Sequence, residues 1–331
     1  MDSKTTVSDH KQTFEISPTI INMLRQHRIV IVVPAYNEER FIGSVVLKIL
    51  QFPVSVIVVD DGSSDNTAFI AEAAGAIAIR HNQNMGKGEA LNTGICEARK
   101  MNPEAIVLID SDGQHLVMEL PRLVQPIFEE GADIVIGSRY LEKTSQVPPH
   151  RVLGHQFFNI VTSLASGVKV SDSQSGYRAF SPKAFNTDLF LSANFSVESE
   201  MQFLAHEHGL KVTEVPITVQ YNDKPKRSVI GQGSMVLTGI LRLMGQYRPL
   251  LFFGVPGAVL LTTGIFFGIW VVDIYRRLQT LAVGYAMVSV LITIIGMLLL
   301  STGIILHSVR GLIIDLDHGR INPDGKYVHP Y

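Results

Sequence analysis

Apolar residues in the first half of the chain fall into short runs that alternate with segments of helical spacing. The runs are rich in β-branched residues, which favours strands, and they lie at 29–33, 54–59, 76–79, 105–109 and 133–137. The intervening segments repeat apolar residues every three or four positions, at 38–50, 65–74, 87–100 and 117–130. This alternation predicts an α/β fold in which a mostly parallel sheet carries helices on both faces.

Two longer apolar runs occupy the last third of the sequence. Residues 250–272 contain no charged side chain, and neither do residues 281–306. As helices they would be about 35 to 39 Å long, enough to cross a hydrocarbon layer of about 30 Å with some tilt. We therefore predict two transmembrane helices, with a buried helical hairpin of a soluble protein as the weaker alternative.

Basic residues on either side of these runs predict an orientation. Eight Lys and Arg residues lie before the first run or after the second, between Lys224 and Lys326, whereas only Arg276 and Arg277 lie between the runs. Lys and Arg concentrate on the cytoplasmic side of membranes. The count of Lys and Arg therefore predicts that both chain ends lie on the cytoplasmic side. Residues 1–28 lack the apolar core of a signal peptide, so we expect the large domain to stay on that side as well.

The segment between the predicted sheet and the membrane is less regular. Residues 151–168 and 235–248 each carry an apolar helical stripe, and the second leads directly into the first apolar run. The expected organisation is an N-terminal extension, a cytoplasmic catalytic domain, an interfacial amphipathic helix, two spans of a multi-pass membrane protein and a cytoplasmic tail, at 1–28, 29–227, 228–249, 250–272, 281–306 and 307–331.

Composition excludes several classes of protein. Hydrophobic residues make up 46% of the chain, ample for a core, and a net charge of −2 gives no basic surface for nucleic acid. The single Cys96 excludes an internal disulfide framework and fits a reducing compartment. The sequence contains neither a GxxxxGK[ST] phosphate loop nor an HExxH zinc motif.

A segment rich in polar residues follows four of the five predicted strands. The segments are PAYNEE, DDGSSDNT, DSDGQH and GSRY, after the first, second, fourth and fifth strands. Any one of them alone is more typical of a turn or a helix cap. Because ligands of such sheets bind at the carboxyl ends of the strands, four polar loops meeting at one edge predict a functional site.

The segment after the fourth strand combines Asp110, Asp112 and Gln114. Residues i and i+2 of an extended chain share a face, so the two carboxylates can point together into the cleft. Hard oxygen ligands suit Mg²⁺ or Mn²⁺, which usually keeps waters and substrate phosphate oxygens in its shell. The alternatives are a helix cap and a pair of solvated charges. We interpret the segment as the site for a metal-bound diphosphate.

Six segments in order carry a family resemblance. They are VVPAYNEE, VVDDGSSDNT, NMGKGEALNTG, DSDGQH, GSRY and DSQSGYRAF, within residues 29–219. The set resembles family-two glycosyltransferases of the Rossmann-like GT-A fold, and more narrowly the dolichyl- or polyprenyl-phosphate sugar synthases. The resemblance implies a nucleotide sugar donor, a polyprenyl or dolichyl phosphate acceptor, a Mg²⁺ or Mn²⁺ cofactor and a lipid bilayer as partner. It leaves self-association into an oligomer open.

The same resemblance implies roles for individual residues. Those expected to bind the donor are Pro34, Ala35, Tyr36, Glu38, Asp60, Asp61, Lys87 and Asp110. Asp110, Asp112 and Gln114 would hold the metal. Those expected to face the acceptor phosphate are Arg139, Arg151, Arg178 and Arg227. Asp112, Arg139 and Arg151 are the catalytic candidates, while Glu198 and Glu200 receive no role.

Chemistry supports this interpretation independently. A lipid phosphate monoester is largely dianionic at pH 7, so the attack needs no general base, but it needs cations to bring two anions together. Direct attack opposite the diphosphate inverts the anomeric centre and gives a β-linked product from an α-linked donor. The motif NMGKGEALNTG resembles that of the glucosyl- or N-acetylglucosaminyl-type synthases more than that of the mannosyl type, and this resemblance implies a UDP-glucose or UDP-N-acetylglucosamine type of donor ahead of GDP-mannose.

Two other functions compete with this interpretation. A processive polysaccharide synthase of the same family would carry QxxRW after the catalytic domain, whereas the single Trp270 lies inside a predicted span. An inactive membrane scaffold with the same fold would not need the intact Asp110, Asp112, Arg139 and Arg151.

Overall fold

The computed structural model describes residues 18–142, 156, 159–160, 162–163, 166–187, 197–220, 245, 248–280 and 282–317. The chain divides into two compact units. The first comprises Met1–Ile160 and Val168–Ser228, and the second comprises Val161–Gly167 and Val229–Tyr331. Of the predicted amphipathic segments 151–168 and 228–249, most residues lie outside the described part, and so do Arg151 and Arg227.

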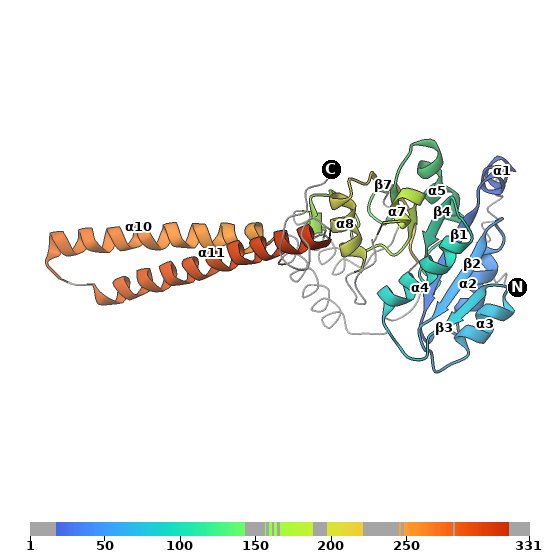
Figure 1. The fold of residues 1–331 in the computed structure, drawn as a ribbon, viewed down its shortest axis with the longest axis horizontal. Coiled ribbons are helices and arrows are strands. Elements are labelled where there is room, and N and C mark those ends of the chain that lie inside the picture. The colour runs from blue at the N-terminus through green and yellow to red at the C-terminus, as the bar shows by residue number, and fades with distance from the viewer. Residues whose placement is uncertain are drawn as a thin grey trace, which may run out of the picture. The chain divides into compact units, whose positions relative to one another are not determined.

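The first unit is built on one seven-stranded mixed sheet, shown as arrows in Figure 1, with strand order β3-β2-β1-β4-β6-β5-β7. Its strands are β1 (Ile29–Ala35), β2 (Ser55–Asp60), β3 (Ile77–Arg80), β4 (Ala105–Leu108), β5 (Ile134–Ser138), β6 (Arg178–Phe180) and β7 (Val212–Pro216). Neighbouring strands are parallel except at β6, which is antiparallel to both β4 and β5. The five strands predicted from the sequence are confirmed.

The helices of this unit cover both faces of the sheet, as the sequence predicts. They are α1 (Pro18–Gln26), α2 (Ile42–Ile49), α3 (Thr67–Ala73), α4 (Lys87–Lys100), the 3₁₀ turn η1 (Val117–Glu119), α5 (Leu120–Glu129), α7 (Pro182–Phe185) and α8 (Val197–Glu207). Alternate β1 residues face opposite ways. Ile31 belongs to the core cluster that α2, α3 and α5 share, whereas Val32 packs on Gly94 of α4.

Proline explains why one predicted helix is divided. The segment 117–130 forms a 3₁₀ turn and then α5, whose first turn contains Pro121. Proline is favoured there because its nitrogen has no hydrogen to leave unpaired. The sequence did not predict β6 or β7. β6 is three residues long, too short for a periodic pattern to reveal.

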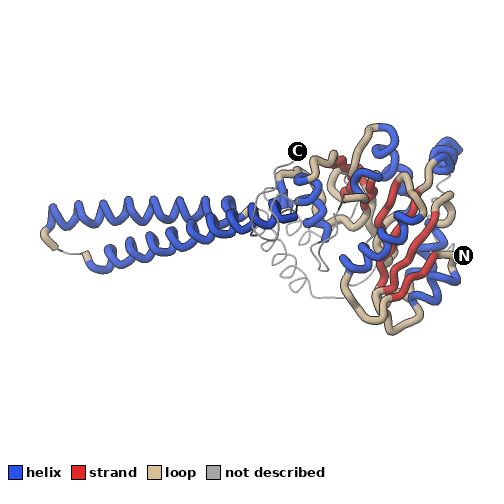
Figure 2. The backbone as a smooth tube through the Cα atoms, viewed as in Figure 1, coloured by secondary structure: helices blue, strands red, loops and turns tan. Residues whose placement is uncertain are grey.

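The second unit contains two long antiparallel helices, drawn in blue in Figure 2. A short π-helix η2 (Leu250–Gly254) leads into α10 (Val255–Leu278), and α11 (Val283–Asp317) follows. By length and composition, Leu250–Leu278 and Val283–Leu312 can each cross a membrane. Both helices extend beyond the predicted spans: α10 continues through residues 273–278, and α11 continues to Asp317.

Small residues let these two helices approach closely. A Cβ atom added to Gly296 would lie 2.3 Å from the backbone nitrogen of Leu261, and one added to Gly257 would lie 2.4 Å from that of Leu300. Ser289 donates a hydrogen bond across the interface to the Gly264 carbonyl at 2.8 Å. Small residues and interhelical hydrogen bonds are typical of helix pairs in membranes.

Candidate active site

The carboxyl ends of β1, β2, β4 and β5 meet at one edge of the sheet. Ala35 at the end of β1 pairs with Asp60 at the end of β2, and Val32 pairs with Leu108 at the end of β4. β6 enters the sheet at this same edge, because Arg178 pairs with Leu108 and with Ile136 of β5. The four polar loops predicted to converge are therefore brought together.

Asp110 lies in a compact charged cluster just beyond β4. Its Oδ1 is 2.7 Å from Lys87 Nζ at the start of α4, and Lys87 Nζ is also 2.7 Å from Glu198 Oε1 on α8. Burial alone would raise the pKa of Asp110, but the ammonium of Lys87 and the contact with His115 together outweigh burial and lower that pKa. The same geometry keeps Lys87 cationic: burial would lower its pKa, and the two carboxylates raise it.

The backbone of Gly176, just before β6, lies directly against the Asp110 carboxylate. A Cβ atom at this position would come within 2.4 Å of Asp110 Oδ2. His115 approaches the same oxygen from another side, with Nε2 3.7 Å away. The carboxylate of Asp110 is thus fixed by segments that lie far apart in the sequence.

Asp112 occupies the turn after Asp110, and β4 itself ends earlier, at Leu108. Among the residues that the structure describes, its carboxylate accepts one hydrogen bond, from the backbone nitrogen of Gln114 at 3.0 Å. Gln114 is held in turn by Gln220, whose backbone nitrogen donates to the Gln114 carbonyl. Burial and then the charge of Asp110 raise the pKa of Asp112.

Gly113 gives this turn its shape. Its φ of +72° lies in the left-handed region that glycine adopts without strain. The turn that Gly113 permits brings the Gln114 nitrogen within hydrogen-bonding distance of Asp112. The glycine is therefore explained by backbone conformation.

These residues fit a hard divalent cation. Asp112 keeps one carboxylate oxygen that no described residue hydrogen-bonds, and a nearby cation would offset the charge that raises its pKa. Within the described ranges, no group of three or more His, Cys, Asp and Glu side chains forms a closed metal cage. Mg²⁺ is commonly held by one or two carboxylates together with waters and substrate phosphates. Asp112 can therefore supply one oxygen to such an ion, and the two other predicted ligands, Asp110 and Gln114, lie two residues before and after it.

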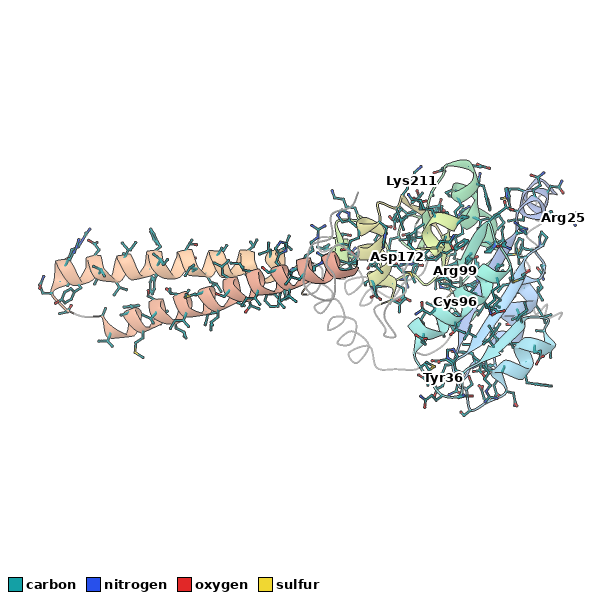
Figure 3. The ribbon with its side chains drawn as sticks, viewed as in Figure 1. Arg25, Tyr36, Cys96, Arg99, Asp172 and Lys211 are labelled. Atoms are coloured by element: carbon teal, nitrogen blue, oxygen red, sulfur yellow. The ribbon has the colours of Figure 1, made fainter. Side chains whose placement is uncertain are left out.

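The loops after β1 and β2 are tied to each other. The backbone nitrogen of Asn37 donates to Ser63 Oγ at 2.8 Å, and that of Glu38 donates to Thr67 Oγ1 at 2.8 Å. Tyr36 is 45% exposed beside these contacts, and Figure 3 labels it. These bonds fix the backbone that carries Tyr36 and Glu38.

The remaining candidates for donor binding differ in their surroundings. Pro34 lines a small pocket together with Lys87 and Asp110, and Ala35 is buried at the end of β1. Asp60 is fully buried, and its Oδ1 accepts a hydrogen bond from the Ser63 nitrogen at 2.9 Å. Pro34 therefore lines the pocket, whereas Ala35 and Asp60 are buried at the paired ends of β1 and β2.

Asp61 organises the loop that precedes Lys87. Its carboxylate accepts hydrogen bonds from the backbone nitrogens of Met85 and Gly86, both at 2.8 Å. The His81 ring contacts the same carboxylate, with Nδ1 2.8 Å from Asp61 Oδ1. Asp61 therefore holds the start of α4 in place, which positions the Lys87 side chain.

Arg139, at the end of β5, forms a two-point ion pair with Asp172. Its Nε and Nη2 each lie 2.6 Å from a different oxygen of that carboxylate, and its backbone nitrogen donates to Oδ2 at 3.1 Å. Asp172 is fully buried, and Figure 3 labels it. This geometry fixes the direction of the guanidinium group.

The structure places Arg178 differently from the expected acceptor contact. The side chain is only 1% exposed. Its guanidinium donates to the backbone carbonyls of Ser175, Glu198 and Ser173 at 2.8, 2.9 and 2.8 Å. These contacts indicate that Arg178 supports the loop before β6 and the start of α8.

Glu198, Gly176 and Asp172 are parts of the site whose roles were not predicted from the sequence. Their contacts to Lys87, Asp110 and Arg139 join distant segments, so no local pattern reveals them. The segment DSQSGYRAF contains Asp172 and Gly176, and Glu198 was singled out from the sequence without a role; these were the available indications that the three residues belong to the site.

The mixed sheet, the acidic turn after β4 and the charged cluster define a sugar transferase with the GT-A fold. Residues 30–189 match glycosyl transferase family 2. A UDP-N-acetylglucosamine–dolichyl-phosphate N-acetylglucosaminyltransferase of Methanococcus voltae is 32% identical over 59% of this chain and 86% of its own length. The chain belongs to glycosyl transferase family 2 and is a glycosyltransferase.

Two further comparisons extend this result. A polyprenol monophosphomannose synthase of Mycolicibacterium smegmatis is 29% identical over 58% of this chain and 77% of its own length. A crystal structure of glucosyl-3-phosphoglycerate synthase from Mycobacterium tuberculosis, in complex with Mg²⁺ and uridine diphosphate, has 25% identity and a TM-score of 0.51, covering 68% of this chain and 83% of that one. The two sequence relatives are named for sugar transfer to lipid phosphates.

Proposed function

We propose that the protein transfers a single hexose from a nucleotide sugar to a polyprenyl or dolichyl phosphate, with inversion. The observation that carries the proposal is the acidic turn after β4, where Asp112 offers an oxygen and Asp110 sits beside a lysine. The named relatives support the lipid phosphate acceptor. We propose a UDP-sugar donor, of glucose or N-acetylglucosamine type, with GDP-mannose as the second choice.

In the proposed reaction, a phosphate oxygen of the acceptor attacks the anomeric carbon opposite the donor diphosphate. The bond from that carbon to the diphosphate oxygen breaks, and the nucleoside diphosphate leaves. Because the acceptor is already dianionic, no side chain has to remove a proton. A bound Mg²⁺ or Mn²⁺ supplies positive charge for the leaving diphosphate.

The chain's own residues orient the two anions. Asp110, Asp112 and Gln114 hold the cation and donor side, and Lys87 adds a positive charge there. Arg139, fixed by Asp172, faces the acceptor phosphate in this proposal. The apolar helices α10 and α11 would anchor the enzyme to the bilayer as a multi-pass hairpin, with the catalytic unit on the cytoplasmic side, where the polyprenyl head group lies.

The direct test uses full-length protein in detergent, a short polyprenyl phosphate and labelled UDP-glucose, UDP-N-acetylglucosamine or GDP-mannose. We expect a lipid-linked sugar in Mn²⁺ or Mg²⁺, little product in EDTA, and a β linkage by proton NMR. Polymer instead of a single lipid-linked sugar would favour a processive synthase. Equal product in EDTA would refute the metal site.

Asp112→Ala tests the site itself. We expect turnover to fall about 100- to 1000-fold, the usual effect of removing one group that stabilises developing charge. The neighbouring Ser111→Ala is the control, because it removes a buried hydroxyl without removing a carboxylate. Near-normal turnover of Asp112→Ala would contradict the assignment.

A further inference from the structure

Lys87 lies between two carboxylates that belong to different parts of the fold. Asp110 follows β4, and Glu198 lies in the first turn of α8. Lys87 Nζ is 2.7 Å from one oxygen of each. A single ammonium group is therefore shared equally by the two acids.

This sharing affects any cation that approaches Asp110. The ammonium of Lys87 already lies on Asp110 Oδ1, so a divalent ion has to compete with it for that oxygen. Glu198 offers the lysine a second carboxylate at the same distance. A shift of Lys87 toward Glu198 would free Asp110 for the ion while the half-buried ammonium of Lys87 keeps a carboxylate partner.

Glu198 is suited to remain in place during such a shift. Its side chain is 11% exposed. Its backbone carbonyl accepts a hydrogen bond from the Arg178 guanidinium at 2.9 Å, which fixes the start of α8. The lysine, with four rotatable bonds, is the flexible partner of the three.

We propose that Lys87 is an internal counter-ion of Asp110, and that Glu198 promotes divalent-cation binding by drawing Lys87 away from Asp110. The inference rests on the proposed function, because it takes Asp110 as part of the cation and diphosphate site. It gives Glu198 the role of a positioning residue that acts through Lys87.

Mn²⁺ binding to the full-length protein in detergent, without donor or acceptor, tests the inference. Electron paramagnetic resonance counts the free Mn²⁺ directly, so the measurement does not depend on turnover. We expect Glu198→Gln to weaken Mn²⁺ binding roughly tenfold, a typical contribution of a residue that supports a metal ligand. We expect Lys87→Met to strengthen binding, because the competing cation is gone; Lys87→Gln repeats the test with a polar side chain.

The double variant separates this inference from a direct effect of charge. In the Lys87→Met variant there is no lysine for Glu198 to draw away from Asp110. The Mn²⁺ affinity of the double variant should therefore differ from that of Lys87→Met alone by less than about twofold. Glu97→Gln is the matched control: it also removes a lysine-paired carboxylate, 2.5 Å from Lys100 on α4, and should leave Mn²⁺ binding unchanged.

Two results would overturn the inference. Either Lys87→Met weakens Mn²⁺ binding, or Glu198→Gln has its full effect in the double variant. If these occur while the wild-type protein makes a lipid-linked sugar, the proposed function stands and the role of Lys87 fails. If the wild-type protein transfers no sugar and binds no Mn²⁺, both proposals fail.

Discussion

Replacing Gly176 by alanine is expected to displace Asp110 and slow sugar transfer. The new Cβ would lie 2.4 Å from Asp110 Oδ2 and 2.8 Å from both Cγ and Oδ1, against 3.4 Å for ordinary contact. Gly176 does not have a positive φ, so this contact, and not backbone strain, opposes alanine. The carboxylate has to retreat by about 1 Å, a displacement that can reduce turnover about 100-fold, or about 2.7 kcal/mol in activation free energy.

The assay measures kcat and the Mn²⁺ concentration for half-maximal rate, together with thermal unfolding. Gly43→Ala is the matched control, since its Cβ would lie 2.9 Å from the Ile70 side chain on α3 and touch nothing in the site. We expect the control to keep normal kcat. If Gly176→Ala also keeps normal kcat and normal Mn²⁺ dependence, the close contact with Asp110 has no role in catalysis.

Three further predictions concern the acceptor side, pH and the helical hairpin. Asp172→Asn should raise KM for polyprenyl phosphate more than KM for the donor, because Arg139 loses its charged partner; equal changes in both would contradict this. Burial would raise the pKa of Asp133, but hydrogen bonds and the charge of Lys183 outweigh it and lower that pKa. The folded protein therefore binds a proton at Asp133 more weakly than the unfolded chain does, and the ionised carboxylate stabilises the fold at pH values above the pKa that Asp133 has in the unfolded chain. Asp133→Asn should therefore lower thermal stability at pH 7, by about 1.5 to 3 kcal/mol, and the difference should shrink as pH falls below about 4; a constant difference would refute the reasoning. Gly296→Leu should separate α10 from α11, detected as faster proteolysis in detergent, whereas Gly284→Leu, with nothing within 4 Å, should not.

Much of the fold follows from local pattern. The β-branched runs at 29–33 and 105–109 became β1 and β4, because strands that are buried on both faces of a sheet need an unbroken run of apolar residues. The two long uncharged runs became α10 and α11 for an equally local reason, since length and apolarity suffice. The acidic turn at 110–114 was also recognisable, because it follows a buried strand directly.

Most of the geometry around that turn could not be predicted. β6 is inserted between β4 and β5, against the order of the sequence, and this brings Gly176 onto Asp110. From the sequence Arg178 was predicted to contact the acceptor phosphate, but in the structure its guanidinium is buried and donates hydrogen bonds to three backbone carbonyls. Its role depends on its neighbours in space.

The sequence by itself determined the α/β sheet, the apolar hairpin and the oxygen-rich turn after β4, because each depends on residues that are close together along the chain. Only the tertiary structure decided that Lys87 stands between Asp110 and Glu198. Those contacts close long loops of chain and are stabilised by burial and charge pairing at the sheet edge. The burial of these side chains and the pairing of their charges both depend on the order of the strands in the sheet, which the local sequence does not specify.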